Sequence, residues 1–223
     1  MQLSNSSLGI FSDCPRCFFF DKKLGIPRPR SIFSSLPNGI DGLLKKSFDS
    51  LRGTLPEFLN REELKGFVLF ENVKKYQNWK SNPLKYKDEN GNVLIGAFDD
   101  ILFRPEDQVY AMLDFKTKGS APDQAYCEKY YQKQVDLYTL LLQSGGLKTA
   151  AFGVLYYFYP ATSDTVGLIK FEQKTFLLEA NADRGKVLFD AAIKVLSLDT
   201  PPPFSGCEYC LFAESHIGKA NPV

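Results

Sequence analysis

The sequence predicts one α/β domain with a mixed central sheet flanked by helices. Strand and helix patterns alternate along the chain without an internal repeat or a low-complexity linker. Of the 223 residues, 44% are hydrophobic and 14% are aromatic, which is enough to bury a sizeable core. We therefore expect residues 1–223 to form a single domain.

The N-terminal half is expected to hold two helices before the first strands. The aromatic run 18–20 predicts a short, largely buried helix, and residues 40–51 carry apolar side chains at helical spacing. Strands are expected at 68–73, 84–87, 93–103 and 108–116. Because Asp-Glu-Asn-Gly at 88–91 is typical of a hairpin turn, the last three strands should form an antiparallel meander.

The C-terminal half is expected to begin with a long helix over residues 123–143, which glycines at 145 and 146 would end. Two strongly apolar stretches, 150–159 and 166–171, predict strands. Residues 181–198 have the spacing of a final amphipathic helix.

Charge and hydropathy narrow the function classes. Lys and Arg number 27 against 26 Asp and Glu, so any nucleic-acid-binding surface must be a local basic patch. No apolar stretch is long enough to span a bilayer, and the first residues do not have the pattern of a signal peptide. We expect a cytoplasmic protein without a membrane partner, in which disulfides are disfavoured.

Charged side chains gather in the stretch 96–119, GAFDDILFRPEDQVYAMLDFKTKG. On a strand, Asp114 and Lys116 point to the same side, and a hairpin would bring Asp99 beside Asp114. Strand alternation sends Asp100 to the opposite side, so we favour Asp99. Charges in an apolar sheet are costly unless they are paired or hold a metal.

This set of side chains suits phosphodiester hydrolysis. Asp99, Asp114 and the main-chain carbonyl of Phe115 offer oxygen ligands to Mg²⁺ or Mn²⁺, which neutralises phosphate charge and activates water. Lys116 would orient the water or offset developing charge. The alternative interpretation is an ion pair at the end of a strand.

Three short motifs occur in the order G-x-x-D, D-x-K-T and Q-x-x-x-Y. They are Gly96-x-x-Asp99, Asp114-Phe115-Lys116-Thr117 and Gln134-x-x-x-Tyr138. The ordered set resembles the PD-(D/E)XK nuclease superfamily, and within it the RecB-like exonucleases, including the CRISPR-associated ones. The resemblance spans Cys14 to Cys210. It implies a restriction-endonuclease-like core in which Gln134 and Tyr138 face the active site and contact DNA or the lysine, although a buried tyrosine beside a satisfied amide is the plainer alternative.

The resembled family often carries a histidine on an early helix, in the pattern H-x-x-L-x-x-x-F. Asp41, Leu44 and Phe48 fit that frame, with Asp41 in the histidine position. An aspartate is a suitable ligand for the same hard cation. The alternative is that Asp41 only caps its helix.

Two CxxC pairs, Cys14–Cys17 and Cys207–Cys210, lie near opposite ends of the chain. Two such pairs can complete a tetrahedral site for zinc or hold a [4Fe–4S] cluster, which would join the termini. The alternative is four unrelated buried cysteines. Cys127 has no CxxC partner, and we interpret it as an ordinary helix residue.

Iron–sulfur members of the resembled branch use one early cysteine in a C-P-R context and three late ones, in the pattern C-x-x-C-x5-C. The third late position here is His216, the single histidine of the chain. Either Cys17 or His216 would complete the ligand set. The resemblance favours iron–sulfur, and zinc stays open as the alternative.

The leading hypothesis is a metal-dependent DNA nuclease, expected to be an exonuclease. Single strands or unpaired ends would run past Gln134 and a group of tyrosines and lysines, Tyr130, Tyr131, Lys118 and Lys133. The alternative for the tyrosines is plain helix packing. A helicase or other nucleic-acid-processing partner would be a separate chain, because the sequence has no Walker-type phosphate loop. The alternatives are a catalytically silent nucleic-acid-binding scaffold of the same fold and a metal-thiolate redox protein.

Overall fold

The structure is a computed structural model that describes residues 1–29, 35–203 and 206–216. The chain groups into two compact units. The first comprises Met1–Ile32, Lys87–Leu94 and Lys186–Val223, and the second comprises Phe33–Tyr86 and Ile95–Gly185. A single domain over residues 1–223 stays a prediction.

The order of elements confirms the α/β fold class. The helices are α1 (Asn5–Asp13), α2 (Pro15–Lys23), α3 (Ser35–Asp49), α4 (Val73–Ser81), α5 (Gln124–Ser144), α6 (Ala182–Leu196) and α7 (Glu208–His216), with short 3-10 helices η1 (Glu57–Leu59) and η2 (Glu62–Leu64). The strands are β1 (Gln2–Ser4), β2 (Val68–Leu69), β3 (Leu84–Lys87), β4 (Val93–Gly96), β5 (Asp100–Arg104), β6 (Val109–Thr117), β7 (Lys148–Thr149), β8 (Phe152–Thr165) and β9 (Leu168–Glu179).

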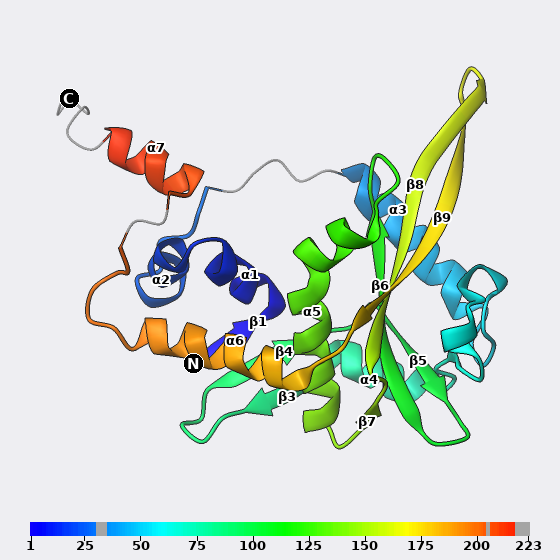
Figure 1. Ribbon diagram of the computed structural model, residues 1–223, viewed down its shortest axis with the longest axis horizontal. Helices are drawn as coiled ribbons and strands as arrows, with labels where there is room; N and C mark the ends of the chain where they lie inside the picture. The colour runs from blue at the N-terminus through cyan, green and yellow to red at the C-terminus, as the bar shows by residue number, and fades with distance from the viewer. Residues whose placement is uncertain (30–34, 204–205, 217–223) are drawn as a thin grey trace. The chain divides into compact units, whose positions relative to one another are not determined.

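The second unit is built on a mixed sheet in the order β2–β5–β6–β8–β9, with β7 also paired to β6 (Figure 1). Strands β5 and β6 run antiparallel, whereas β6 and β8 run parallel. Residues 109–115 of β6 are all buried, because this strand lies inside the sheet with both faces covered. The long β8–β9 hairpin continues beyond the other strands and exposes apolar side chains near its tip.

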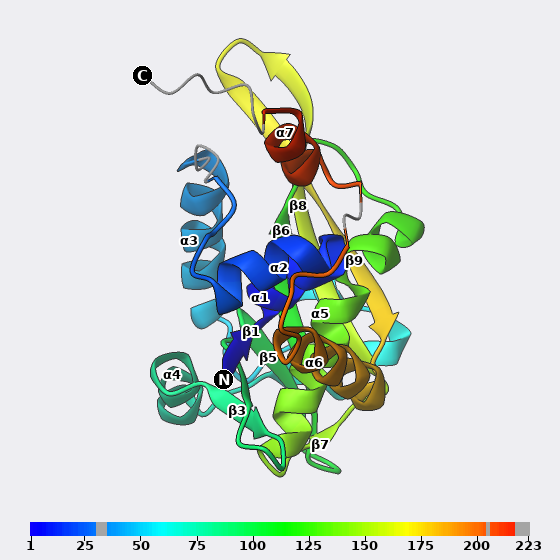
Figure 2. The same cartoon turned by 90° about the vertical axis from the view of Figure 1, so that its left-hand side faces the viewer.

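Helices cover both faces of this sheet. On one face, Phe48 of α3 packs against Phe115 with a ring-centroid distance of 4.4 Å, and it also contacts Tyr156. On the other face, Gln134 of α5 reaches Asp114. The view of Figure 2 shows α3 and α5 on opposite sides of β6 and β8. Adjacent residues of β6 therefore serve different faces, as strand alternation requires.

The predicted meander is wrong, because residues 93–103 do not form one strand. Strand β4 ends at Gly96 and belongs to a three-stranded sheet in the order β1–β4–β3, whereas β5 begins at Asp100 in the larger sheet. Gly96 lies so close to α5 that a Cβ there would be 2.7 Å from Leu141 Cδ1. The break leaves residues 97–99 outside both ladders, which matters for Asp99.

Several element boundaries also differ from prediction. The strand expected at 68–73 ends at Leu69, and Val73 starts α4. The side chain of Asn72 caps that helix by accepting a hydrogen bond from Lys75 N at 3.0 Å, which is a local signal the apolar pattern concealed. Residues 166–167 form the turn of the β8–β9 hairpin, and β9 extends to Glu179.

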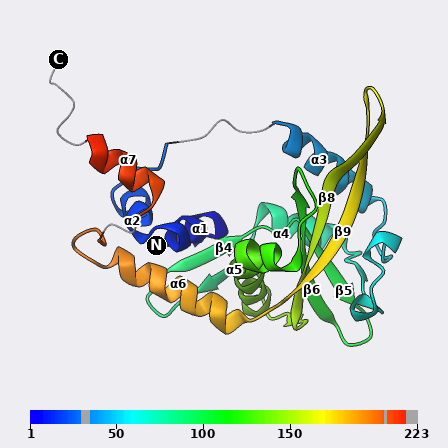
Figure 3. The ribbon, with the colours of Figure 1, turned by 45° about the horizontal axis from the view of Figure 1, so that its top comes forward.

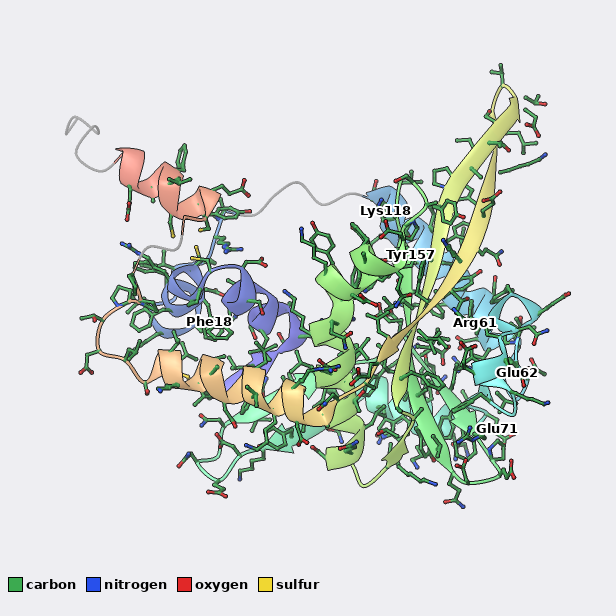
Figure 4. The ribbon with its side chains drawn as sticks, in the orientation of Figure 1. Phe18, Arg61, Glu62, Glu71, Lys118 and Tyr157 are labelled. Carbon is green, nitrogen blue, oxygen red and sulfur yellow. The ribbon has the colours of Figure 1, made fainter. Side chains whose placement is uncertain are left out.

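The first unit contains α1, α2, most of α6 and α7. Cys14 ends α1 and also caps α2, so these two helices follow each other without a loop. Phe18 and Phe19 are buried as predicted (Phe18 is labelled in Figure 4). Helix α7 lies beside α2 (Figure 3), where their cysteines meet. None of the described helices has the length and hydrophobicity that a membrane crossing needs.

Candidate active site and cysteine centre

The β5–β6 register brings the two aspartates of the predicted motif together. Asp100 pairs with Leu113, so Asp99 lies just before β5 and opposite Asp114. Phe115 N donates a hydrogen bond to Asp99 Oδ2 at 3.1 Å, which holds this carboxylate against the edge of β6. Tyr76 donates to the carbonyl oxygen of Asp99 at 2.5 Å, which fixes the backbone of the broken segment.

Asp114 is more enclosed than Asp99, with 4% of its side chain exposed against 24%. Gln134 Nε2 donates a hydrogen bond to its Oδ1 at 2.7 Å, and Lys116 Nζ forms an ion pair with its Oδ2. Burial raises the pKa of Asp114 to about 7, and the negative charge of Asp99 adds to the shift while Lys116 opposes it. Oδ2 therefore already faces a cation, the Lys116 ammonium, and a carboxylate oxygen in this position is also a suitable ligand for a hard divalent cation.

Tyr138 lies one turn after Gln134 on the same face of α5. Its ring packs edge-on against Phe98 with a centroid distance of 5.0 Å. Burial raises the pKa of Tyr138, and the charge of Asp114 adds to the shift. A Cβ at Gly96 would lie 2.9 Å from Tyr138 Cε1, so only glycine fits the start of the G-x-x-D motif.

Lys45 of α3 is a site residue that the sequence reasoning missed. Its Nζ lies 2.8 Å from Asp99 Oδ1 and 2.7 Å from Asp41 Oδ2. Asp41 is therefore linked to the pair of aspartates through this ammonium group. The i, i+4 spacing of Asp41 and Lys45 was visible in the sequence and could have indicated an ion pair.

Asp100 points away from this cluster. Arg52 donates two hydrogen bonds to it, from Nη1 to Oδ1 at 2.5 Å and from Nη2 to Oδ2 at 2.9 Å. Burial raises the pKa of Asp100, and Arg52 opposes that shift. Asp100 is thus held in an ion pair with Arg52, and Asp99 is the aspartate that lies beside Asp114.

Tyrosines and lysines from the start of α5 and the end of β6 adjoin the cluster. Lys116 Nζ lies 4.6 Å from the ring centroid of Tyr131, and Lys118 Nζ lies 4.8 Å from that of Tyr126. Tyr130 is 49% exposed and packs against Tyr126. Figure 4 shows Lys118 near the first turn of α5 and Tyr157 on neighbouring β8. Lys133 lies farther along α5 and is half-buried.

The cysteine centre lies within the first unit. The sulfurs of Cys14, Cys17, Cys207 and Cys210 all lie within 4.8 Å of one another, so the four residues could hold a metal. Cys17 Sγ is 3.5 Å from Cys207 Sγ and 3.6 Å from Cys210 Sγ. The structure thus brings together the two CxxC pairs as predicted and makes four unrelated cysteines the wrong interpretation.

Cys127 and His216 are the other two residues considered as ligands or thiols in the sequence analysis. Cys127 is buried in α5 of the second unit, away from the four clustered thiols in the sequence, as expected for an ordinary helix residue. His216 ends α7, but its side chain lies outside the described residues. Burial raises the pKa of Cys17 and Cys210, so metal binding would release their protons.

The sequence matches the model of the PD-(D/E)XK nuclease superfamily over residues 31–215. The chain therefore belongs to this superfamily, whose members are generally nucleases, and its fold implies a nucleic-acid substrate. A search of curated proteins found no match. The predicted superfamily is confirmed, and the RecB-like branch stays a prediction.

Proposed function

We propose that the protein is a Mg²⁺- or Mn²⁺-dependent DNA nuclease of the RecB-like branch. The observation that carries this proposal is the convergence of Asp99, Asp114 and Lys116 at the edge of β6. An inactive scaffold would have no need to keep a buried carboxylate beside a half-buried lysine, which is a costly arrangement. The order of the three motifs supports the branch.

Asp99, Asp114 and the main-chain carbonyl of Phe115 would hold the metal, with Asp41 as a further oxygen ligand. The bound metal supplies Lewis-acid stabilisation of the phosphate and an activated water. In the structure, the single ammonium of Lys45 pairs with both Asp41 and Asp99 and leaves a net charge of −1, and a divalent cation would replace it as their counter-ion. Oxygen ligands alone match the preference of Mg²⁺ and Mn²⁺.

The protein groups around the metal ligands have distinct roles in the proposal. Gln134 fixes the rotamer of Asp114 through its 2.7 Å hydrogen bond. Lys116 keeps its ammonium beside Asp114, where it would orient water or stabilise charge on the phosphate. Tyr138 backs this cluster and would contact DNA or the lysine.

The substrate proposed is single-stranded DNA or an unpaired end. Tyr131 lies beside Lys116, and the exposed Tyr130 packs on Tyr126, which lies beside Lys118; stacking of bases on such rings is tolerant of sequence. Exonuclease action rests on the branch resemblance. Linear and circular single-stranded DNA test it, because an exonuclease degrades the linear form and leaves the circle intact.

The nuclease proposal is tested with labelled single- and double-stranded DNA in Mg²⁺, Mn²⁺ or EDTA. Asp114→Asn and Lys116→Met should each lower the cleavage rate at least about a hundredfold. Glu106→Gln and Lys148→Met change exposed side chains beside the first residue of β6, at the other end of the strand from Asp114; they serve as matched controls and should retain full activity. Cleavage that persists in EDTA, or that survives both site variants, would refute the proposal.

Two other functions make different predictions in the same samples. A silent nucleic-acid-binding scaffold would retain DNA binding and show no metal-dependent cleavage in the unmodified protein. A metal-thiolate redox protein would show a reversible redox transition at the cysteine centre, and Asp114→Asn would leave that transition unchanged. The carboxylate cluster favours the nuclease, since neither alternative uses it.

A further inference from the structure

We propose that the cysteine centre binds a single zinc ion through four thiolates, in place of the [4Fe–4S] cluster that the branch resemblance favours. The observation is the separation of the four sulfur atoms. The Sγ–Sγ distances are 3.8 Å for Cys14–Cys210, 3.5 Å for Cys17–Cys207 and 3.6 Å for Cys17–Cys210.

These separations are those of a tetrahedron around one ion. A Zn–S bond of about 2.3 Å places tetrahedral ligands about 3.8 Å apart, because a tetrahedral edge is about 1.6 times the centre-to-corner distance. These three separations lie within about 0.3 Å of that value. The upper limit of 4.8 Å for all pairs keeps the four sulfurs around a single centre.

An iron–sulfur cube does not fit the same positions. Each cysteine of such a cluster binds a different iron at a different corner, so its thiolates lie outside the cube and farther apart than four ligands of one ion. To admit a cube, α2 and α7 would have to separate and both CxxC turns would have to open. The ligand set also differs from that of the iron–sulfur members of the resembled branch, because it has two early and two late cysteines where they have one early and three late ones.

The two CxxC pairs form matching halves of the site. Cys14 precedes α2 and accepts a hydrogen bond from Cys17 N at 3.5 Å, and Cys207 precedes α7 and accepts one from Cys210 N at 3.4 Å. Each half therefore presents its sulfurs at the N-terminus of a nine-residue helix. Backbone N–H groups and the helix ends stabilise thiolate charge on both sides.

Arg28 supplies the cation that such a centre needs. One divalent ion and four thiolates leave a net charge of about −2. The Arg28 guanidinium lies near Cys17 and stacks on the ring of Tyr209 at 4.6 Å, where it partly offsets that charge. Its contact with Asp13 holds it in place at 3.5 Å. Tyr209 lies between the two late cysteines, so this cation is tied to both halves.

The direct test is the metal content of the full chain, purified anaerobically without a histidine tag from cells supplied with both iron and zinc. We expect about one zinc per chain and a colourless protein. After exchange with Co²⁺, a tetrahedral thiolate site should give intense visible and near-ultraviolet bands. A brown protein with about four irons per chain overturns the proposal, as does a protein that takes up neither zinc nor cobalt.

Variants identify the ligands independently of nuclease activity. Cys17→Ser and Cys207→Ser should lose zinc, and a chelator should lower the melting temperature of the unmodified protein. Cys127→Ala, which changes a buried cysteine outside the centre, and His216→Ala should both retain about one zinc per chain. Retention of zinc by Cys17→Ser together with its loss from His216→Ala would overturn the four-cysteine assignment. If the serine variants fail to fold, the metal content of the unmodified protein still decides.

Discussion

Replacing Arg52 with methionine is expected to destabilise the protein strongly, because the buried carboxylate of Asp100 loses its ion-pair partner. The Arg52 and Asp100 side chains are only 8% and 1% exposed and share two hydrogen bonds. Without the guanidinium, Asp100 keeps the hydrogen bond from the backbone N–H of Ile101 at 2.7 Å. Breaking a buried ion pair from one side costs about 3–5 kcal/mol, since the remaining charge is unpaired.

The two partners should behave unequally. Asp100→Asn removes the buried charge and leaves Arg52 with its exposed partner Asp49, so a loss of about 1–3 kcal/mol is expected. The double variant Arg52→Met/Asp100→Asn should lose less than the sum of the two single losses. The difference is a coupling energy of about 1.5–3 kcal/mol, as for residues in one hydrogen-bonded network.

The assay is urea unfolding followed by the fluorescence of Trp79, the single tryptophan. This side chain is buried in the same unit and stacks on Phe70, so its signal reports the loss of that packing. For a urea slope of about 2 kcal/mol per molar, Arg52→Met should lower the midpoint by roughly 2 M. The control Lys65→Met removes a highly exposed pair with Glu62 and should change stability by less than about 0.5 kcal/mol. Equal effects of the two methionine variants would refute the reasoning.

Two further changes probe the candidate active site. Gly96→Ala should lower the free energy of unfolding by about 1–3 kcal/mol and slow cleavage, because the new methyl group displaces the Tyr138 ring. Thermal melting and cleavage rates measure the effect. Gly119→Ala is the control, since its Cβ would meet nothing within 4 Å. Lys45→Met should tighten Mn²⁺ binding by about fivefold, since the metal no longer competes with an ion pair worth about 1 kcal/mol. Calorimetric titration beside the exposed control Lys46→Met measures the change, and unaltered or weaker Mn²⁺ binding would contradict it.

Much of the fold could be predicted because its strongest signals are local. The long helix α5, apolar in its second half, and the strand β6 follow from side-chain periodicity, and the fold class follows from the order of elements. The division of 93–103 into two strands could not, because it depends on the close approach of α5 to Gly96. Residues 96–100, Gly-Ala-Phe-Asp-Asp, contain no dipeptide typical of a tight turn, so the apolar residues on either side were read as one strand although they belong to different sheets.

The candidate site shows the same division between local and tertiary information. Strand alternation predicted that Asp114 and Lys116 share a side, and the structure places them in contact. Asp99 was placed beside Asp114 for a partly wrong reason, since it lies before β5 and not within a continuous strand. Lys45 was missed because its contact with Asp99 joins residues 54 positions apart along the chain, from 45 to 99.

Burial of β6 links the stability of the fold to the chemistry proposed for the site. Alternation places Phe115 in the core and Asp114 on the opposite face, yet both are buried because helices cover both sides of the strand. The same enclosure that stabilises the sheet raises the pKa of Asp114, so the carboxylate is held at a cost in folding energy. Gln134 and Lys116 offset part of that cost in the absence of a metal. A divalent cation would offset it more fully, and the fold is therefore expected to gain stability from the same ion that its proposed chemistry requires.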